Sequence, residues 1–310
     1  MNMTSKKWLI TGGAGFIGSA TARQLLKLGQ SVIIYDDFSS SSLRDVKDIK
    51  NKIKIIKAGI EDEKALKKAF KGIDFVFHFA AVASVAQSAA DPDRTYDINI
   101  KGTYNVLTAA KNAGVKRVVF ASSAAIYGDS KAPLKESVLP ECRSLYATSK
   151  FIGEELCKIF YNLHSLETVC LRYFNVFGPA QKVNSEYRSV VDMFLESAKK
   201  GDTFSFEWDG RQRRDFLFIT DAARAGILAA QKAKPGQSYN VSGGKAYTLL
   251  ELADIIESVA GKKMKRRFFP KRAGDIRYSA ADIRKIGRIG FKPEIDLKRG
   301  IKIIWDDTNV

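Results

Sequence analysis

Three glycines follow a short apolar run near the start of the chain, in the stretch Trp8-Leu9-Ile10-Thr11-Gly12-Gly13-Ala14-Gly15-Phe16-Ile17-Gly18. The pattern predicts a strand, a tight loop and the first turn of a helix. Gly12 permits the turn, Gly15 lets backbone N–H groups approach a pyrophosphate, and Gly18 lets the helix pack closely on the strand. A helix N-terminus attracts negative charge, so the loop is suited to an anion. A tight turn without a ligand would need the same glycines, so the residues that follow must distinguish a ligand-binding loop from a plain turn.

The sequence after this loop matches a dinucleotide site. A helix is predicted over 16–28, ending at Gly29, and a second strand, Ser31–Asp36, ends on an acid at the expected spacing of about twenty residues. Asp36 is placed to accept hydrogen bonds from the adenosine ribose hydroxyls, and its charge would repel a 2′-phosphate. The pattern therefore favours NAD over NADP.

Apolar strands and helical stretches then alternate along the chain. Strands are predicted at 52–57, 74–79 and 115–121, and helices at 63–70 and 93–113. The run 74–79 is apolar throughout, which is typical of a parallel strand buried on both faces. We therefore expect an α/β fold, a doubly wound parallel sheet of the Rossmann type with a smaller α/β substrate lobe. The expected division is an NAD-binding domain over 1–175, to which some later segments return, and a lobe over 176–310 that mainly binds the substrate.

Composition narrows the class of protein. The chain has no run of about 18 apolar residues and no signal-peptide core near its start, so we expect a soluble, cytoplasmic protein. Its three cysteines and two histidines lack metal-ligand spacing, so no metal is expected and His78 is interpreted as a packed core residue. The net charge is +17, with the densest basic cluster at 262–267. We interpret it as a solvated basic surface, with nucleic-acid binding as the alternative.

Two further segments are placed to line a cofactor pocket. The polar loop Asp37-Phe38-Ser39-Ser40-Ser41-Ser42 follows the acid, and either lines an adenosine pocket or caps helices in a solvated loop. The small residues Ala80-Ala81-Val82-Ala83 follow the strand 74–79. Because a cofactor lies at the carboxyl ends of such strands, small side chains there would make room for it, although close packing would also use them.

A candidate catalytic set follows the strand 115–121. That strand runs into Ser122-Ser123-Ala124-Ala125-Ile126-Tyr127-Gly128, and Tyr146 and Lys150 form a Y-x-x-x-K pattern on a helical stretch. Residues four apart share one helix face. A tyrosine pKa is ordinarily about 10, but a lysine ammonium and a nicotinamide cation close by would stabilise the phenolate. Tyr146 is thus the candidate base, and Ser123 is the candidate hydroxyl that relays the substrate proton.

Together these motifs resemble the extended short-chain dehydrogenase/reductase family, and within it the nucleotide-sugar 4-epimerases of the UDP-glucose and UDP-N-acetylglucosamine type. The resemblance covers nearly the whole chain. It extends to the stretches His78-Phe79-Ala80-Ala81, Asn99-Ile100-Lys101-Gly102-Thr103, Ser122 to Asp129, Arg172-Tyr173-Phe174-Asn175-Val176-Phe177-Gly178-Pro179, Arg214-Asp215-Phe216 and Arg272-Ala273-Gly274-Asp275.

The resemblance implies roles for individual residues. Phe16 and Ile17 would place backbone amides on the pyrophosphate, Lys150 would hold the nicotinamide ribose, and Asn175 would contact the substrate diphosphate. Arg214 and Arg272 would clamp that diphosphate, because a guanidinium fork matches phosphate oxygens; a surface position is the alternative for each arginine. The candidate cofactor site comprises Gly12, Gly15, Phe16, Ile17, Gly18, Asp36, Asp37, Phe38, Ser40, Gly59, Ile60, Phe79, Ala80, Ala81, Asn99, Tyr146, Lys150 and Tyr173. The candidate substrate site comprises Ser84, Ser123, Asn175, Arg214, Arg272, Asp275 and Ser279.

The chain departs from the family pattern at three places. Ala58-Gly59-Ile60 replaces a G-D-I or G-D-V whose Asp lies near adenine, which leaves the Ile60 backbone as the expected substitute. Ala180 stands where many relatives carry an arginine, and Trp208 stands where a glycine is usual. These departures concern the pocket and leave the catalytic set intact.

The resemblance implies a redox-neutral epimerisation of a UDP-hexose at C4. Tyr146, helped by Ser123, would take the 4-hydroxyl proton while hydride passes from C4 to NAD, and the 4-keto sugar would turn over and receive the hydride on its other face. The resemblance also implies that Ser279 lies at the wall of the hexose pocket, where it is small enough to admit an acetamido group, unless Tyr278 turns in instead. A homodimer through the helices around 93–113 and 143–164 is also implied.

Two rival functions remain open at this point. Dehydratases and decarboxylases on the same scaffold carry acids directly after the Ser/Thr, where this chain has Ala124 and Ala125. A non-catalytic NAD-binding or RNA-binding relative would commonly lack the tyrosine or the lysine, and both are present here. We therefore expect a UDP-sugar as the partner, and neither nucleic acid nor membrane.

Overall fold

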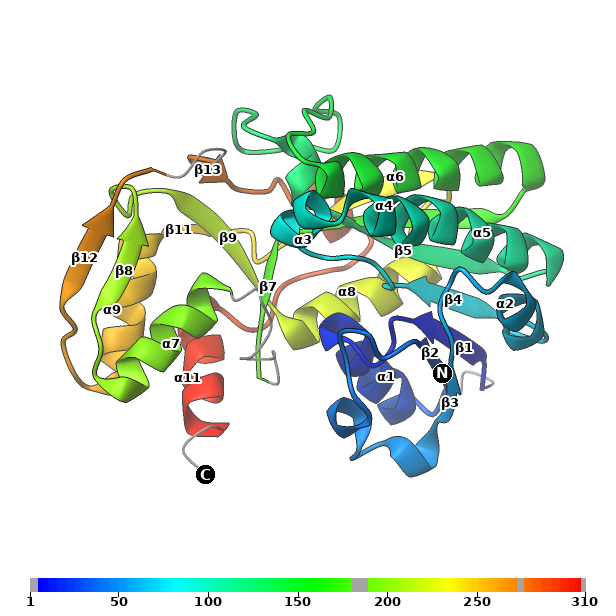
Figure 1. The fold of residues 1–310 in the computed structure, drawn as a ribbon, viewed down its shortest axis with the longest axis horizontal. Coiled ribbons are helices and arrows are strands. Elements are labelled where there is room, and N and C mark those ends of the chain that lie inside the picture. The colour runs from blue at the N-terminus through cyan, green and yellow to red at the C-terminus, as the bar shows by residue number, and fades with distance from the viewer. Residues whose placement is uncertain (1–4, 180–188, 272–275, 308–310) are drawn as a thin grey trace.

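A seven-stranded sheet forms the centre of the molecule in the computed structural model, which describes residues 5–179, 189–271 and 276–307. Every neighbouring pair of its strands is parallel. In spatial order the strands are β10 (Gln237–Val241), β6 (Glu167–Tyr173), β5 (Arg117–Ser123), β4 (Phe75–His78), β1 (Lys7–Thr11), β2 (Ser31–Asp36) and β3 (Lys54–Lys57) (Figure 1). The doubly wound parallel sheet predicted from the sequence is confirmed.

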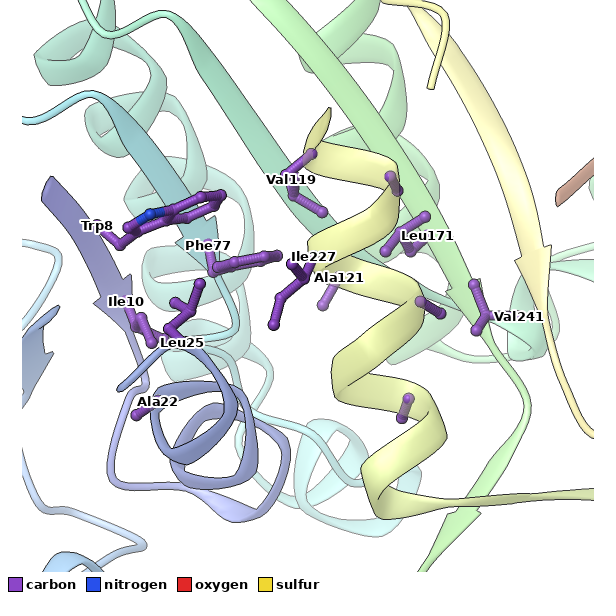
Figure 2. Packing of buried hydrophobic residues seen from close by; sticks show 14 of the residues in the cluster. Trp8, Ile10, Ala22, Leu25, Phe77, Val119, Ala121, Leu171, Ile227 and Val241 are labelled. Carbon is purple, nitrogen blue, oxygen red and sulfur yellow. The ribbon is translucent and has the colours of Figure 1, made fainter. Parts of the chain in front are cut away.

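Helices cover both faces of this sheet because its strands are apolar on both sides. One face packs against α1 (Phe16–Lys27) and α8 (Ile219–Lys232). Figure 2 shows side chains of neighbouring strands, including Phe77 and Val119, directed at Ile227 of α8. The alanines of α8 are mostly buried, and their small side chains let this helix lie close to the sheet.

The opposite face packs against three helices, α2 (Glu63–Ala69), α5 (Thr103–Asn112) and α6 (Leu145–His164). Leu9, Val118 and Phe120 point to this side, one residue out of phase with those that face α8. Helix α6 begins at Ser144, whose side chain accepts a hydrogen bond from the Ala147 N–H. This cap fixes the start of the helix that carries Tyr146 and Lys150.

The stretch predicted as one helix over 93–113 is divided in the structure. It consists of α4 (Pro92–Thr95), a π-helical segment η3 (Tyr96–Gly102) and α5. A Cβ at Gly102 would come within 2.5 Å of the Ile60 side chain, so glycine permits a close approach to the loop after β3. Single π turns inside helices are frequent at functional sites, and this one contains Asn99.

A second lobe is built around its own aromatic core. Its strands are β7 (Asn175–Phe177), β8 (Phe204–Glu207), β9 (Arg213–Phe218), β11 (Ala246–Thr248), β12 (Arg266–Phe269) and β13 (Tyr278–Ser279), and its helices are α7 (Val190–Lys200), α9 (Leu249–Ala260) and α11 (Leu297–Asp307) (Figure 1). Phe194, Phe204 and Phe206 pack in its interior. Strand β10 follows β9 in the chain but lies in the central sheet, beside β6.

Short elements complete the chain. They are the helices α3 (Val85–Ala90) and α10 (Arg284–Gly287) and the 3₁₀ turns η1 (Leu43–Val46), η2 (Lys50–Lys52) and η4 (Ala124–Tyr127). Within the described ranges, the helices are too short or too polar to cross a lipid bilayer.

Candidate active site

A cavity of about 1120 Å³ lies at the carboxyl ends of the central strands and continues to the second lobe. Its wall is formed by the glycine-rich loop, the ends of β2, β4 and β5, helix α6, and residues of β7, β9 and β13. In open α/β sheets ligands bind outside the carboxyl ends of the strands. The cavity is therefore where the fold places a ligand.

The glycine-rich loop has the shape that a pyrophosphate requires. Gly12 has a φ of +64°, and a Cβ there would lie 2.6 Å from the Ala80 nitrogen. A Cβ at Gly18 would overlap the Gly12 carbonyl oxygen. Helix α1 begins after Gly15 without a side-chain cap, and Gly15, Phe16 and Ile17 line the cavity. Its N-terminal amides thus face the space where an anion would lie.

Asp36 is held at the end of β2 with its side chain at the cavity. It is 7% exposed, and its carboxylate accepts hydrogen bonds from Ala14 N at 2.9 Å, Phe38 N at 2.9 Å and Ser41 Oγ at 2.8 Å. Asp36 thereby also ties the polar loop to the glycine-rich loop. A fixed carboxylate at this position can accept hydrogen bonds from the adenosine ribose hydroxyls of NAD and would repel the 2′-phosphate of NADP.

The polar loop after Asp36 reaches the cavity in part. Asp37 and Ser40 line it, whereas Phe38 does not. Phe38 adopts a left-handed backbone conformation with a φ of +61°, and its ring packs on the core under α1. The side chain predicted to contact the cofactor is thus directed away from the cavity.

Small residues bound the cavity at the end of β4. Phe79, Ala80 and Ala81 line it, together with Ser84, whose side chain accepts a hydrogen bond from Gln87 N at the start of α3. Gly59 and Ile60, Tyr173, and the catalytic candidates also line this cavity.

Asn99 supports the cavity wall without lining it. Its side chain accepts from Val82 N at 2.8 Å and donates to the Val82 carbonyl at 3.0 Å and to Ser149 Oγ at 2.9 Å. Ser149 in turn donates to the Tyr146 carbonyl at 2.8 Å. The π-helical segment therefore links the loop after β4 to the helix that carries the Y-x-x-x-K pattern.

Ser123, Tyr146 and Lys150 all line this cavity. Lys150 is 5% exposed and donates a hydrogen bond from Nζ to the Ala121 carbonyl at 2.9 Å. Its Nζ lies 5.9 Å from the centre of the Tyr146 ring. Burial lowers the Lys150 pKa to about 8, because removal from water disfavours the ammonium form. Ser123 Oγ accepts from Ala125 N at 3.1 Å, which orients its hydroxyl.

His78 lies beneath the site as a core residue. It is 1% exposed, with Nδ1 2.7 Å from Thr11 Oγ1 and Nε2 3.0 Å from Thr103 Oγ1. Thr103 donates its own proton to the Asn99 carbonyl, so Nε2 of His78 must be the donor and Nδ1 the acceptor. Burial, with a smaller contribution from Lys150, lowers the His78 pKa to about 3.

The second lobe brings further candidate residues to the opposite wall. Asn175, Arg214 and Ser279 line the cavity, and Ser279 lies beside Arg214 in the parallel pair β13–β9. Arg214 donates to the Ile276 carbonyl at 2.9 Å, which holds its guanidinium at this wall. Tyr278 is 48% exposed and does not line the cavity. Arg272 and Asp275 lie outside the described residues.

Sequence reasoning missed several polar residues of the wall. Gln212 lines it two residues before Arg214, is 2% exposed, and donates from Nε2 to the Glu207 carbonyl at 2.6 Å. The alternation of an extended chain, counted back from Arg214, would have found it. Arg94 also lines the cavity, from the short helix α4, whose start is capped by Asp91 with Pro92 at its first position.

Two of the three departures from the family pattern lie in described residues. Trp208 has a φ of +66°, a conformation that glycine adopts freely and that other residues adopt at a cost of about 1–2 kcal/mol. Its ring lies against two cations, Lys271 Nζ at 4.3 Å and the Arg277 guanidinium at 4.5 Å. At Gly59, the space of the absent side chain holds the Glu61 carboxylate. Ala180 lies outside the described residues.

Comparison with known proteins gives consistent results. The sequence pattern of the NAD dependent epimerase/dehydratase family matches residues 8–242 of this chain. The chain is 34% identical to a putative UDP-glucose 4-epimerase of Methanocaldococcus jannaschii, over 97% of this chain and 98% of the relative. It is 31% identical to a UDP-N-acetyl-alpha-D-glucosaminuronate decarboxylase of Bacillus cytotoxicus, over 96% of each. The solved structure of a UDP-N-acetylglucosamine 4-epimerase from Methanobrevibacter ruminantium, in complex with UDP-N-acetylmuramic acid, superposes with a TM-score of 0.94 at 36% identity, covering 99% of this chain and 100% of the other.

Proposed function

The chain belongs to the NAD-dependent epimerase/dehydratase family, and we propose that it inverts the C4 configuration of UDP-hexoses, including UDP-N-acetylglucosamine and UDP-N-acetylgalactosamine. The observation that carries the proposal is the convergence of Ser123, Tyr146 and Lys150 on one cavity whose adjoining residues, Ala124 and Ala125, bear only methyl groups. These residues can move a proton and stabilise charge, but Ala124 and Ala125 offer no second acid beside Ser123.

NAD fits the other half of the cavity. The glycine-rich loop leaves room for backbone amides to meet a pyrophosphate, and Asp36 offers its carboxylate beside it. When bound, NAD supplies a hydride acceptor and returns the hydride within the same turnover. The protein binds and orients the two reactants and handles the proton.

The Tyr146 hydroxyl would exchange the proton with the substrate. As phenolate it would remove the proton of the sugar 4-hydroxyl, and as phenol it would return it, so that the enzyme is unchanged after each cycle. The Lys150 ammonium lies close enough to favour the phenolate, and its hydrogen bond to Ala121 fixes its position. Ser123, which lines the same cavity, would hydrogen-bond the same sugar oxygen.

Elimination and decarboxylation are less well supported, although one relative is a decarboxylase and the family includes dehydratases. Loss of water from C5 and C6 of a sugar needs an acid for the departing oxygen. Among the described residues, the acids that line the cavity lie elsewhere on its wall. They are Asp36, Asp37, Asp45, Glu61, Asp91 and, in the second lobe, Glu207. Ala124 and Ala125 provide none beside Ser123.

The second lobe would hold the UDP-sugar. Asn175 and Arg214 offer an amide and a guanidinium to its diphosphate, and Arg272 and Asp275 remain predictions from the sequence. Ser279, and not Tyr278, faces the cavity, which favours space for a 2-acetamido group. This is why the proposal includes the N-acetylated sugars.

We also propose a homodimer through the outer surface of η3, α5 and α6. Four large apolar side chains are exposed on these elements, and they are Tyr96, Tyr104, Ile159 and Leu163. A second copy would cover them with the same surface. Light scattering after gel filtration tests this, and a monomer at micromolar concentration would contradict it.

The function itself is tested by incubating the purified protein with UDP-N-acetylglucosamine and, separately, with UDP-glucose, without added cofactor. The denatured protein is extracted and its NAD content measured in parallel. The proposal expects bound NAD and formation of the 4-epimer of each sugar. Protein that contains NAD but leaves both sugars unchanged would contradict it and favour a non-catalytic relative.

A further inference from the structure

The cavity continues beyond Asp36 to the loop that follows β3. Residues 58–61 of this loop line the cavity together with Asp36 and Asp37. In a doubly wound fold the adenosine ribose lies at the acid that ends the second strand, and Asp36 has that position. A base carried by such a ribose would meet the part of the wall that residues 58–61 form.

This loop is held in place from two sides. Tyr35 Oη donates to the Gly59 carbonyl at 2.8 Å, and Asn105 Nδ2 donates to the Ile60 carbonyl at 3.3 Å. Asp62 N also donates to the Gly59 carbonyl, at 3.2 Å, which closes the turn. Side chains of β2 and α5 therefore fix the backbone from which Glu61 projects.

The Glu61 carboxylate occupies the space of a side chain that Gly59 lacks. A Cβ built at Gly59 would overlap Glu61 Oε2 and would lie 3.1 Å from the carboxyl carbon. Absence of a side chain at position 59 is thus what lets Glu61 fold back over the turn. This part of the wall thus carries the Glu61 carboxylate in addition to the Ile60 backbone.

The neighbouring acid, Asp62, makes a structural contact and does not face the cavity. Asp62 caps helix α2, with its carboxylate accepting a hydrogen bond from Ala65 N at 2.9 Å, and it does not line the cavity. Glu61 does line the cavity and is exposed. Of these two acids, Glu61 is the one whose carboxylate a bound nucleotide can reach.

The structure assigns to Glu61 the recognition of the adenine base of the dinucleotide: its carboxylate accepts a hydrogen bond from the exocyclic 6-amino group. A carboxylate can only accept, so it selects a base edge that donates. Hypoxanthine carries a carbonyl oxygen at the same position, and two acceptors facing each other would repel. Glu61 thereby discriminates between adenine and a 6-oxopurine. The assignment rests on NAD binding and not on the proposed sugar substrate.

The test compares NAD with nicotinamide hypoxanthine dinucleotide, which differs only at that group. Holoprotein is incubated with an excess of both dinucleotides in equal amounts until the bound ratio is constant, and the retained dinucleotides are quantified by mass spectrometry. The wild-type protein should retain NAD over the analogue by about tenfold, the scale of one hydrogen bond to a charged group in a solvated site. Glu61→Ala should reduce this ratio to about twofold or less.

Two further variants separate recognition from general effects of charge or folding. Glu63→Ala removes the same charge two residues away, from a residue that does not line the cavity, and should keep the wild-type ratio. Gly59→Asp combined with Glu61→Ala returns a carboxylate to the same space from the other residue, and should restore the preference for NAD. Equal retention of the two dinucleotides by the wild type, or an unchanged ratio in Glu61→Ala, would overturn the assignment.

Discussion

Lys150 of α6 donates a hydrogen bond from Nζ to the carbonyl oxygen of Ala121 in β5, at 2.9 Å. This contact joins the helix that carries Tyr146 to the strand that ends at Ser123. The proposed chemistry depends on this arrangement, because Ser123 lies more than twenty residues before Tyr146 and Lys150 in the chain.

Removal of the Tyr146 hydroxyl is expected to abolish proton transfer and leave binding intact. Tyr146→Phe should lower turnover by about 100-fold or more, the usual contribution of a positioned acid–base group, while the NAD content stays near that of the wild type. Turnover and extracted NAD are measured on the same preparation. Turnover close to the wild-type value would rule out Tyr146 as the base.

His78 makes stability depend on pH. Its folded pKa of about 3 lies below the ordinary value of 6.5, so the unfolded chain binds a proton between these values while the folded protein does not. Stability from His78 is therefore complete above pH 6.5 and decreases as the pH falls. Between pH 7.5 and pH 5.0 the wild type should lose about 2 kcal/mol more than His78→Gln. Urea unfolding of both proteins at the two pH values checks this, and a constant difference would contradict it.

The sequence was sufficient to predict those features of the fold and the site that depend on residues close together in the chain. Three features can each be recognised from a few neighbouring residues: the glycine loop, the acid Asp36 at a strand end, and the Y-x-x-x-K pattern on one helix face. The structure places all three at one cavity. The π-helical segment around Asn99 was not predicted, and the close approach of Gly102 to Ile60 beside it joins residues that are distant in the chain. The position of the Glu61 carboxylate over Gly59 and the inward packing of Phe38 likewise depend on tertiary neighbours.

Asp36 is expected to set the choice between NAD and NADP. Asp36→Asn removes the charge and keeps one acceptor oxygen, so it retains only one of the contacts with Ala14 N and Phe38 N, which bond to different carboxylate oxygens of Asp36. Affinity for NAD should fall and discrimination against NADP should weaken, because the repulsion of the 2′-phosphate is lost. Competition between the two cofactors measures the change, with Asp48→Asn, an acid outside the cavity wall, as the control. Equal binding of both cofactors by the wild type would show that the role given to Asp36 is wrong.

Ser279 is expected to control the size of the 2-substituent. Ser279→Tyr should lose activity on UDP-N-acetylglucosamine and keep activity on UDP-glucose, because an overfilled pocket costs about 1–3 kcal/mol. Tyr278→Ser, a change at the neighbouring residue that does not line the cavity, should leave the ratio of the two activities unchanged. The two activities are compared as kcat/KM. The argument fails if Ser279→Tyr also leaves that ratio unchanged.

The most direct test of the account is proton NMR of UDP-N-acetylglucosamine incubated with the purified protein in D₂O. Inversion at C4 by hydride transfer and return predicts that UDP-N-acetylgalactosamine forms, that hydrogen is retained at C4, and that C6 keeps its hydroxymethyl group. A product that has lost its C6 oxygen, deuterium at C4 of the epimer, or no epimer from protein that contains NAD would contradict the account.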